Sequence, residues 1–388
     1  MSENQSRKKK FTSEKTGEAA SEDARQASIK PGEPLSAGPR ISWDIGTAYD
    51  LFFSLYVLHL PEKFGLRASW AAGVRSRLNT EDRKVLATAQ KLFYVPLCWI
   101  YSLPEPKDAE TALWALRQIP AGERLQALTF CDLAPEKIQS FLNNIADRGA
   151  WEDQDLEALR KIYQEKGKEK PRPKELADML DAWANVAEFG EHYLSALQAY
   201  YNAFYAEEQR RIGPAIQKGL QSAKDLAERL PLTELIAELS HGVRFEEPLD
   251  KPEIIFVPSF WIQPLIYFSL VSQHAMLIVF GFRPEDMSVV PGEQVPDSIL
   301  LGLKALSDPT RLRILRYLNR ENLSPADLAR RLRLRAPTVT HHLRSLRLAG
   351  LVHMTVGKEH ESRYTARLET IEELCDRINV FLASVDEE

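Results

Sequence analysis

The sequence predicts a mainly α-helical fold with a small β component, arranged as a tail and two parts of different composition. Residues 1–40 are polar, residues 41–296 hold all seven tryptophans, and residues 298–368 carry fourteen Lys and Arg against five Asp and Glu. A chain of 388 residues that is 44% hydrophobic can give each part a core. We therefore expect a disordered tail over residues 1–40, a mostly helical sensor or regulatory domain over residues 41–296, and a further domain over residues 297–388.

The tail and the cysteines indicate the cellular compartment. The first forty residues contain no apolar run typical of a signal peptide, so a cytoplasmic protein is expected. Cys98, Cys131 and Cys375 are far apart and form no CxxC spacing, which argues against a disulfide framework and against a zinc knuckle. Reduced thiols are the expected state.

Residues 41–241 show the apolar spacing of amphipathic helices. One helix is predicted to begin with Asn79 or Thr80 as its cap. Residues 171–211 keep a three-to-four spacing over many turns, which predicts one long helix or two in tandem that meet near Gly190.

Residues 254–282 contain no charged side chain, and this length raises the possibility of a membrane span. Pro258, Pro264 and several polar residues would interrupt a spanning helix, whereas three segments within the stretch have the length and composition of strands. We therefore predict short buried strands near residues 253–281, with a buried helix as the alternative, and no membrane contact.

The basic segment from residue 298 to residue 368 has a charge balance of +9, which leaves −14 for the rest of the chain. A basic segment joined to an acidic remainder is typical of proteins that meet a polyanion. Charge alone does not separate DNA from RNA or a membrane.

Two helices with strong start signals open this segment. Asp308 precedes Pro309, and Ser324 precedes Pro325 with Asp327 at the capping-box position. The residues predicted to face the core are Leu312, Ile314, Leu315 and Leu318 in the first helix and Leu328 and Leu332 in the second.

A third helix, opened by Pro337, has two different faces. Val339, Leu343 and Leu346 fall on one side. The other side carries short hydrogen-bonding side chains at its N-terminal end, which can reach base edges in the DNA major groove, and an arginine that can bond guanine or a phosphate. Gly350 is predicted to end the helix as a left-handed cap.

Two short strands and a final helix are predicted to complete the chain. The strands surround a turn at Gly357 and Lys358, so that Lys358 and Arg363 lie on a hairpin. The final helix carries an apolar stripe that suits either packing within the chain or a dimer seam, formed by Ile371, Leu374, Ile378 and Phe381 or Leu382.

Together these residues resemble the winged helix-turn-helix of the ArsR/SmtB-type bacterial transcription regulators. The similarity covers residues 298–384, under a quarter of the chain. The family's patterns are matched by residues 303–311 with Ile314 and Leu315, by residues 337–343 with Leu346, by residues 349–352, and by Tyr364 at the close of the wing.

The resemblance implies binding to a double-stranded DNA operator, normally as a homodimer, with transcription controlled by a signal. It implies base or phosphate contacts for Thr338, Thr340 and His341, with Arg344 beside them and a wing that follows the DNA backbone or minor groove. The predicted DNA-binding residues are Arg335, Pro337, Thr338, Thr340, His341, Arg344, Ser345, Lys358 and Arg363.

The family's metal ligands are missing from this sequence. Residues 322–327, where the family's metal sensors carry a pair of cysteines, contain no thiol, and the last helix has no histidine. No metal and no cofactor are therefore expected, and an unidentified small-molecule effector of the front part remains a candidate partner.

His341 and His342 are neighbours in the third helix and look at first like one site. Adjacent helical residues point about 100° apart, so the two rings cannot easily hold one metal ion from the same face. The helix also offers neither histidine a nucleophile or carboxylate for catalysis. We expect His341 on the outer face and His342 packed against the wing or the preceding helix.

Two alternatives to a DNA-binding regulator remain. A winged helix can serve protein–protein contact, which the basic balance and the polar outer face disfavour. A catalytic front domain is disfavoured because the sequence contains no GxSxG, HExxH, P-loop or GxGxxG motif, and His192, His241 and His274 are isolated. We therefore expect no enzyme.

Overall fold

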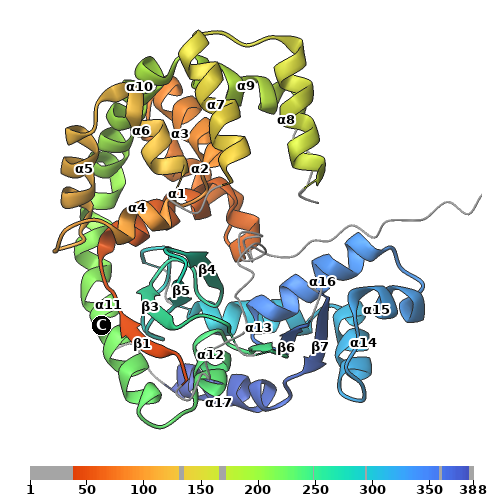
Figure 1. Ribbon diagram of the computed structural model, residues 1–388. Helices are drawn as coiled ribbons and strands as arrows, with labels where there is room; N and C mark the ends of the chain where they lie inside the picture. The colour runs from red at the N-terminus through yellow and green to blue at the C-terminus, as the bar shows by residue number, and fades with distance from the viewer. Residues whose placement is uncertain are drawn as a thin grey trace, which may run out of the picture.

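The computed structural model describes residues 38–130, 135–165, 172–247, 249–292, 295–357 and 361–383 (Figure 1). The predicted tail lies outside these residues up to residue 37. Helices dominate and the strands are short, as predicted. In chain order the elements are β1 (Arg40–Trp43), α1 (Thr47–His59), the 3₁₀ turn η2 (Pro61–Phe64), α2 (Ala68–Arg75), α3 (Thr80–Leu92), α4 (Leu97–Tyr101), α5 (Ala109–Gln118), α6 (Ala121–Thr129), α7 (Glu136–Arg148), α8 (Asp153–Glu165), α9 (Pro173–Ala184), α10 (Val186–Tyr200), the π-helical turn η3 (Tyr201–Tyr205), α11 (Ala206–Ala227), α12 (Leu232–Leu239), β2 (Val243–Phe245), β3 (Glu253–Ser259), β4 (Ile266–Leu270), β5 (Ala275–Gly281), α13 (Asp297–Leu306), α14 (Pro309–Leu318), α15 (Pro325–Leu332), α16 (Ala336–Leu348), β6 (Val352–Val356), β7 (Ser362–Ala366) and α17 (Glu369–Ala383).

Four strands form sheet A in the order β1-β3-β5-β4, in which β1, β3 and β5 are parallel and β4 runs antiparallel to β5. Strands β3 and β5 are buried along almost their whole length, which explains their continuous apolar sequences. The prediction of short buried strands near residues 253–281 is confirmed. Among the described residues, no helix is both long and apolar enough to cross a membrane.

The helices α1 to α10 lie above sheet A in Figure 1, and α1 runs along the side of this layer that is nearest the sheet. Residues 48–58 of α1 are all buried. At α3, Asn79 is the N-cap and its side chain accepts a hydrogen bond from the backbone N–H of Asp82 at 2.8 Å. The predicted cap at Asn79 or Thr80 is therefore resolved in favour of Asn79.

The predicted break near Gly190 is wrong, because α10 passes through Gly190 and the chain breaks at Asn185. Gly190 serves helix packing instead. A Cβ atom at this position would lie 2.1 Å from the carbonyl oxygen of Ala121, so only glycine allows α6 and α10 to approach so closely.

The C-terminal part contains α13 to α17 with β6 and β7. Asp308 caps α14 by accepting from the N–H groups of Thr310 and Arg311, and Ser324 forms a capping box with Asp327, both as predicted. Leu312 was predicted to face the core, but its side chain is 48% exposed. Ile314, Leu315 and Leu318 define the buried face, and a residue two positions before Ile314 lies nearly opposite on a helix of 3.6 residues per turn.

On α17, the predicted stripe includes Phe381 rather than Leu382, which is 72% exposed. Leu374 packs within the chain, against Gly302 of α13, where a Cβ atom would lie 2.6 Å from a Leu374 methyl carbon.

Cys98 and Cys375 are free thiols, and Cys131 lies outside the described residues.

A second sheet, sheet B, joins the front part of the chain to the C-terminal hairpin. Its strand order is β2-β6-β7, with β2 parallel to β6 and β6 antiparallel to β7. One face of this sheet packs on sheet A through residues that include Phe245, Met354 and Val356, and the rings of Phe245 and Phe268 lie 5.3 Å apart. Sequence reasoning placed no strand at β2.

Candidate nucleic-acid interface

The helix-turn-helix is formed by α15, a short turn and α16. Arg333 ends α15 in the left-handed conformation, with φ of 56°, and the N–H of Leu334 donates to the carbonyl of Ala329 at 3.0 Å. This tight turn sets the angle at which α16 leaves α15. The inner face of α16 is as predicted, because Val339, Leu343 and Leu346 are buried in the core of the C-terminal part.

The outer face of α16 presents its predicted residues to solvent mainly at the N-terminal end. Arg335, Pro337, Thr338 and His341 are exposed. No carboxylate belongs to α16, so this end of the helix combines small polar groups with positive charge. Such a surface suits the negatively charged major groove of DNA.

The next residues along that face are less accessible. Thr340, Arg344 and Ser345 are half-buried. The hydroxyl of Thr340 donates to the carbonyl of Ala336 at 3.0 Å, and that of Ser345 donates to the carbonyl of His341 at 3.2 Å. Both hydroxyls keep only their acceptor capacity for an outside partner unless they rotate.

The two histidines occupy different environments. His341 is exposed, whereas the side chain of His342 is only 14% exposed and its Nδ1 lies 3.9 Å from Oδ1 of Asp308. Burial lowers the pKa of His342, while backbone N–H donors, chiefly that of Arg311, lower the pKa of Asp308. His342 therefore sits at the N-cap of α14, a neighbour that the sequence did not indicate.

No group of three or more potential metal ligands occurs among the described residues.

The wing consists of β6 and β7, and a bridge between Leu323 and Tyr364 extends its sheet on the far side of β7. Arg363 is half-buried and its guanidinium lies 3.5 Å from the carbonyl of Asn322. Lys358, the other predicted wing contact, lies outside the described residues.

Further exposed arginines lie on α14 and α15 and in the turns that follow these helices, and they were not among the predicted contacts. Arg330 is paired with Asp327, and Arg331 with Glu321 at 2.6 Å, so these two are partly neutralised. The other exposed arginines of this region are Arg313, Arg316, Arg320 and Arg333. The excess of Lys and Arg in the basic segment is the sequence signal that could have predicted these arginines as DNA contacts.

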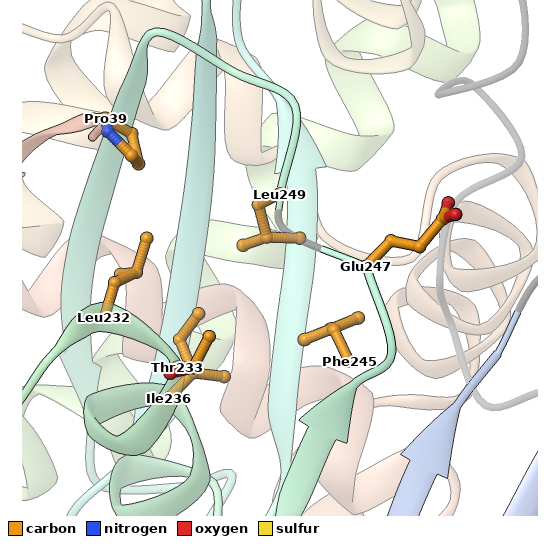
Figure 2. A pocket seen from close by; sticks show the side chains of 7 residues that line it. All are labelled: Pro39, Leu232, Thr233, Ile236, Phe245, Glu247 and Leu249. Carbon is orange, nitrogen blue, oxygen red and sulfur yellow. The ribbon is translucent and has the colours of Figure 1, made fainter. Parts of the chain in front are cut away.

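Two hollows lie where α12 meets β2. Figure 2 shows a small apolar cavity of about 50 Å³, lined by Pro39, Leu232, Thr233, Ile236, Phe245, Glu247 and Leu249. Ligand pockets usually enclose about 300 to 1,000 Å³, so this cavity is too small for a drug-sized molecule. A larger open groove of about 550 Å³ has walls from α12, β2, β6 and the start of α17, and its lining includes Glu238, Arg244 and His353.

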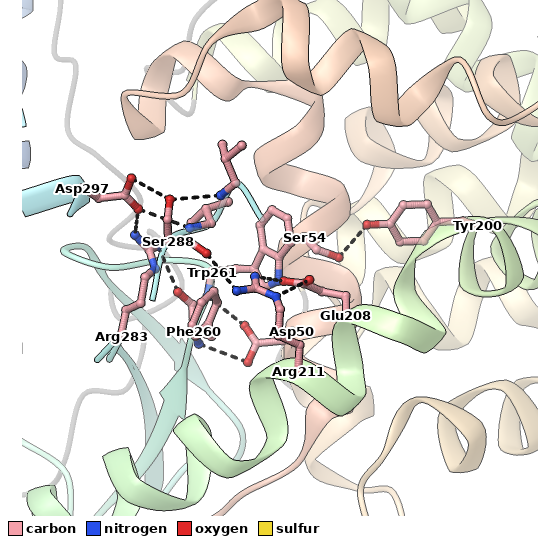
Figure 3. Close-up of polar contacts among 12 residues, drawn as sticks. Asp50, Ser54, Tyr200, Glu208, Arg211, Phe260, Trp261, Arg283, Ser288 and Asp297 are labelled. Atoms are coloured by element: carbon pink, nitrogen blue, oxygen red, sulfur yellow. Dashed lines mark hydrogen bonds and ion pairs between the residues drawn. The ribbon is translucent and has the colours of Figure 1, made fainter. Parts of the chain in front are cut away.

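A buried polar network connects the front helices to the start of α13 (Figure 3). Asp50 of α1 is fully buried and accepts hydrogen bonds from the hydroxyl of Ser259 at 2.5 Å and from the N–H groups of Phe260 at 3.2 Å and Trp261 at 3.1 Å. Burial outweighs these bonds and raises the pKa of Asp50 to about 6.

The network continues through two arginines that flank one aromatic ring. The guanidinium carbons of Arg211 and Arg283 lie 4.9 and 5.0 Å from the centroid of the Phe260 ring. Arg211 binds Glu208, and Arg283 binds Asp297, the first residue of α13. Charged side chains therefore bridge the end of sheet A and the first helix of the C-terminal part.

Comparison with known proteins agrees with this architecture for the C-terminal part. Residues 306–355 match a family model described as a helix-turn-helix domain. A 97-residue segment is 34% identical to a protein of Synechocystis sp. named "Transcriptional repressor SmtB homolog" and covers 25% of this chain and 64% of that relative. No solved structure matches the chain significantly. The C-terminal part thus contains a helix-turn-helix of the ArsR/SmtB type.

Proposed function

We propose that this protein is a sequence-specific, DNA-binding transcription regulator that acts as a repressor in the cytoplasm. It binds a double-stranded operator through α16 and the wing, has no enzymatic activity, and responds through its front part to an effector other than a metal ion. The relative's repressor name supports the direction of regulation.

The observation that carries this proposal is the composition of the exposed end of α16. Arg335, Thr338 and His341 are accessible there, while the opposite face of the same helix is anchored in the core. Specific DNA contacts require such side chains on a helix that is held rigidly enough to enter the major groove.

We further propose that the protein acts as a homodimer with a seam formed by α13 and α17. Val380 and Leu382 of α17 are 70% and 72% exposed, and Leu303 of α13 is 48% exposed. Exposed apolar residues on two packed helices suit a symmetric contact. Replacing Val380 and Leu382 together with glutamate should lower the mass measured by analytical ultracentrifugation from dimer to monomer.

The test of the DNA-binding proposal is a comparison of binding to the DNA upstream of the gene with binding to random duplex, over a range of salt concentrations. Thr338→Ala and Arg344→Ala should each reduce the preference for the specific site by about 1 to 3 kcal/mol. Arg160→Ala is the matched control, because Arg160 is an exposed arginine on α8 that leaves the interface untouched.

Equal affinity of the wild-type protein for both duplexes would contradict sequence-specific binding. Failure to bind any duplex at low salt would favour a protein-contact role for the winged helix. Thermal unfolding of each variant shows whether a loss of binding reflects a loss of folding.

A further inference from the structure

Strand β2 lies more than a hundred residues before the wing in the sequence and nevertheless forms its third strand. The N–H of Met354 donates to the carbonyl of Gly242 at 2.9 Å, and the N–H of Glu246 donates to the carbonyl of Val356 at 3.1 Å. These two hydrogen bonds lie just before and just after β2 and fix its register on β6. The front part of the chain is therefore built into the surface that carries the predicted wing contacts.

The register aligns two arginines on one face of sheet B. Arg244 of β2 pairs with Thr355 of β6, which pairs with Arg363 of β7. Paired residues on neighbouring strands point to the same side, and strands lie about 4.8 Å apart, so the Cα atoms of Arg244 and Arg363 are separated by roughly 10 Å. We call Arg244, Thr355 and Arg363 the cross-strand row.

The opposite face of sheet B is the one that packs inside the protein. Phe245, Met354 and Val356 alternate with the cross-strand row and belong to the apolar cluster on sheet A. The row therefore points away from sheet A. It also lies close to the tip of the wing, since Thr355 is two residues before Gly357.

Arg244 forms no ion pair within the described part of the chain, although Glu234, Glu238 and Glu369 line the groove that it borders. Its guanidinium contacts only the ring of His353, at 3.5 Å between Nη2 and Nε2, and its side chain is exposed. Neighbouring arginines differ, because Arg330, Arg331 and Arg367 each lie within 3.3 Å of a carboxylate oxygen. Arg363 resembles Arg244, with a backbone carbonyl as its contact.

We propose that Arg244 is a DNA-binding residue that the front part contributes to the wing, and that it shares with Arg363 the contact to the phosphate backbone. The proposal rests on the DNA-binding function proposed above. The front part then contributes directly to the affinity for the operator, because β2 positions Arg244. A phosphate contact carries no sequence information, so it should strengthen binding to every duplex.

The experiment measures binding of the full-length protein to specific and random duplex between 50 and 200 mM salt. Each phosphate contact contributes about 0.9 to the slope of log affinity against log salt, so Arg244→Ala should make the affinity change over this range about threefold smaller. The loss should be equal for both duplexes. Arg244→Lys should retain the slope, and Arg244→Glu should weaken binding more than Arg244→Ala does.

Arg160→Ala again removes one exposed positive charge and should leave the slope unchanged. If Arg244→Ala behaves like Arg160→Ala while Thr338→Ala abolishes the preference for the specific site, Arg244 is not in the interface and only this inference fails. If the wild-type protein binds no duplex at low salt, the DNA-binding function itself fails. Unchanged melting temperatures of the Arg244 variants separate the effect from misfolding.

Discussion

Arg283 and Asp297 form a buried ion pair with 2.5 Å between Nη1 and Oδ2, and this pair ties the end of sheet A to the first turn of α13. The side chain of Arg283 is only 7% exposed, and its second amino group donates to the carbonyl of Phe260 at 3.1 Å. Removing the carboxylate would leave a buried guanidinium without its counter-charge, which is costly in a medium of low polarity.

Asp297→Asn should therefore lower the free energy of unfolding by about 3 kcal/mol. Urea denaturation of the full-length protein measures the change. Asp286→Asn, which alters an exposed carboxylate in the same loop, should stay within about 0.5 kcal/mol of the wild type. Equal stability of the two variants would show that the ion pair contributes little.

The buried carboxyl of Asp50 should make stability depend on pH. Its pKa is raised from 3.8 to about 6 in the folded protein, so between these values the folded state holds a proton that the unfolded chain has released. The contribution of Asp50 to the free energy of unfolding therefore falls as pH rises from about 4 to about 6, by an amount on the order of 2 kcal/mol. Asp50→Asn should abolish this decrease in the free energy of unfolding between about pH 4 and about pH 6. Asp147→Asn, which alters an exposed carboxylate, should retain the decrease. Parallel pH profiles for Asp50→Asn and the wild type would refute the assignment.

His241 should act in the opposite direction. Burial, together with the nearby Arg367 and Arg377, lowers its pKa from 6.5 to about 4. The unfolded chain takes up a proton near pH 6.5 and the folded state does not, so stability is lost as pH falls from about 6.5 to about 4, again on the order of 2 kcal/mol. Asn tolerates the left-handed backbone of residue 241, where φ is 53°. His241→Asn should therefore remain folded and lose less stability on acidification than exposed His192→Asn; equal losses would contradict the prediction.

Gly190→Ala tests the close approach of α6 and α10. The added Cβ atom meets a backbone oxygen at 2.1 Å, so the helices must separate and the free energy of unfolding should fall by more than about 2 kcal/mol. Gly73→Ala is the matched control, since no atom lies within 4 Å of its Cβ position in α2. That change should stabilise the protein by up to about 1 kcal/mol, because alanine favours a helix over glycine. Similar melting temperatures for the two variants would contradict the packing argument.

The features predicted correctly from the sequence are those that neighbouring residues determine. Asp308 and Ser324 cap helices through bonds to N–H groups two or three residues away, and the buried face of α16 follows from helical periodicity. The buried strands of sheet A were recognisable because β3 and β5 are each seven residues long and almost entirely apolar.

The features missed depend on distant partners. Strand β2 has three residues, Val243 to Phe245, and only its pairing with β6 makes it a strand. The packing role of Gly190 within α10 depends on the approach of α6, and the place of His342 depends on Asp308 of α14. In the candidate site, sequence spacing identified the exposed end of α16 but not that Thr340 and Ser345 bond their own helix.

The participation of β2 in sheet B has a consequence for fragments of this protein that lack the front part. A fragment beginning at residue 297 would retain α13 to α17 and the hairpin but would lose the strand that covers β6. Its free edge would expose unpaired backbone groups of residues 354–356, with Met354 and Val356 deprived of the apolar residues of sheet A. Such edges recruit strands from other chains, so a fragment that contains only the helix-turn-helix should self-associate through its wing.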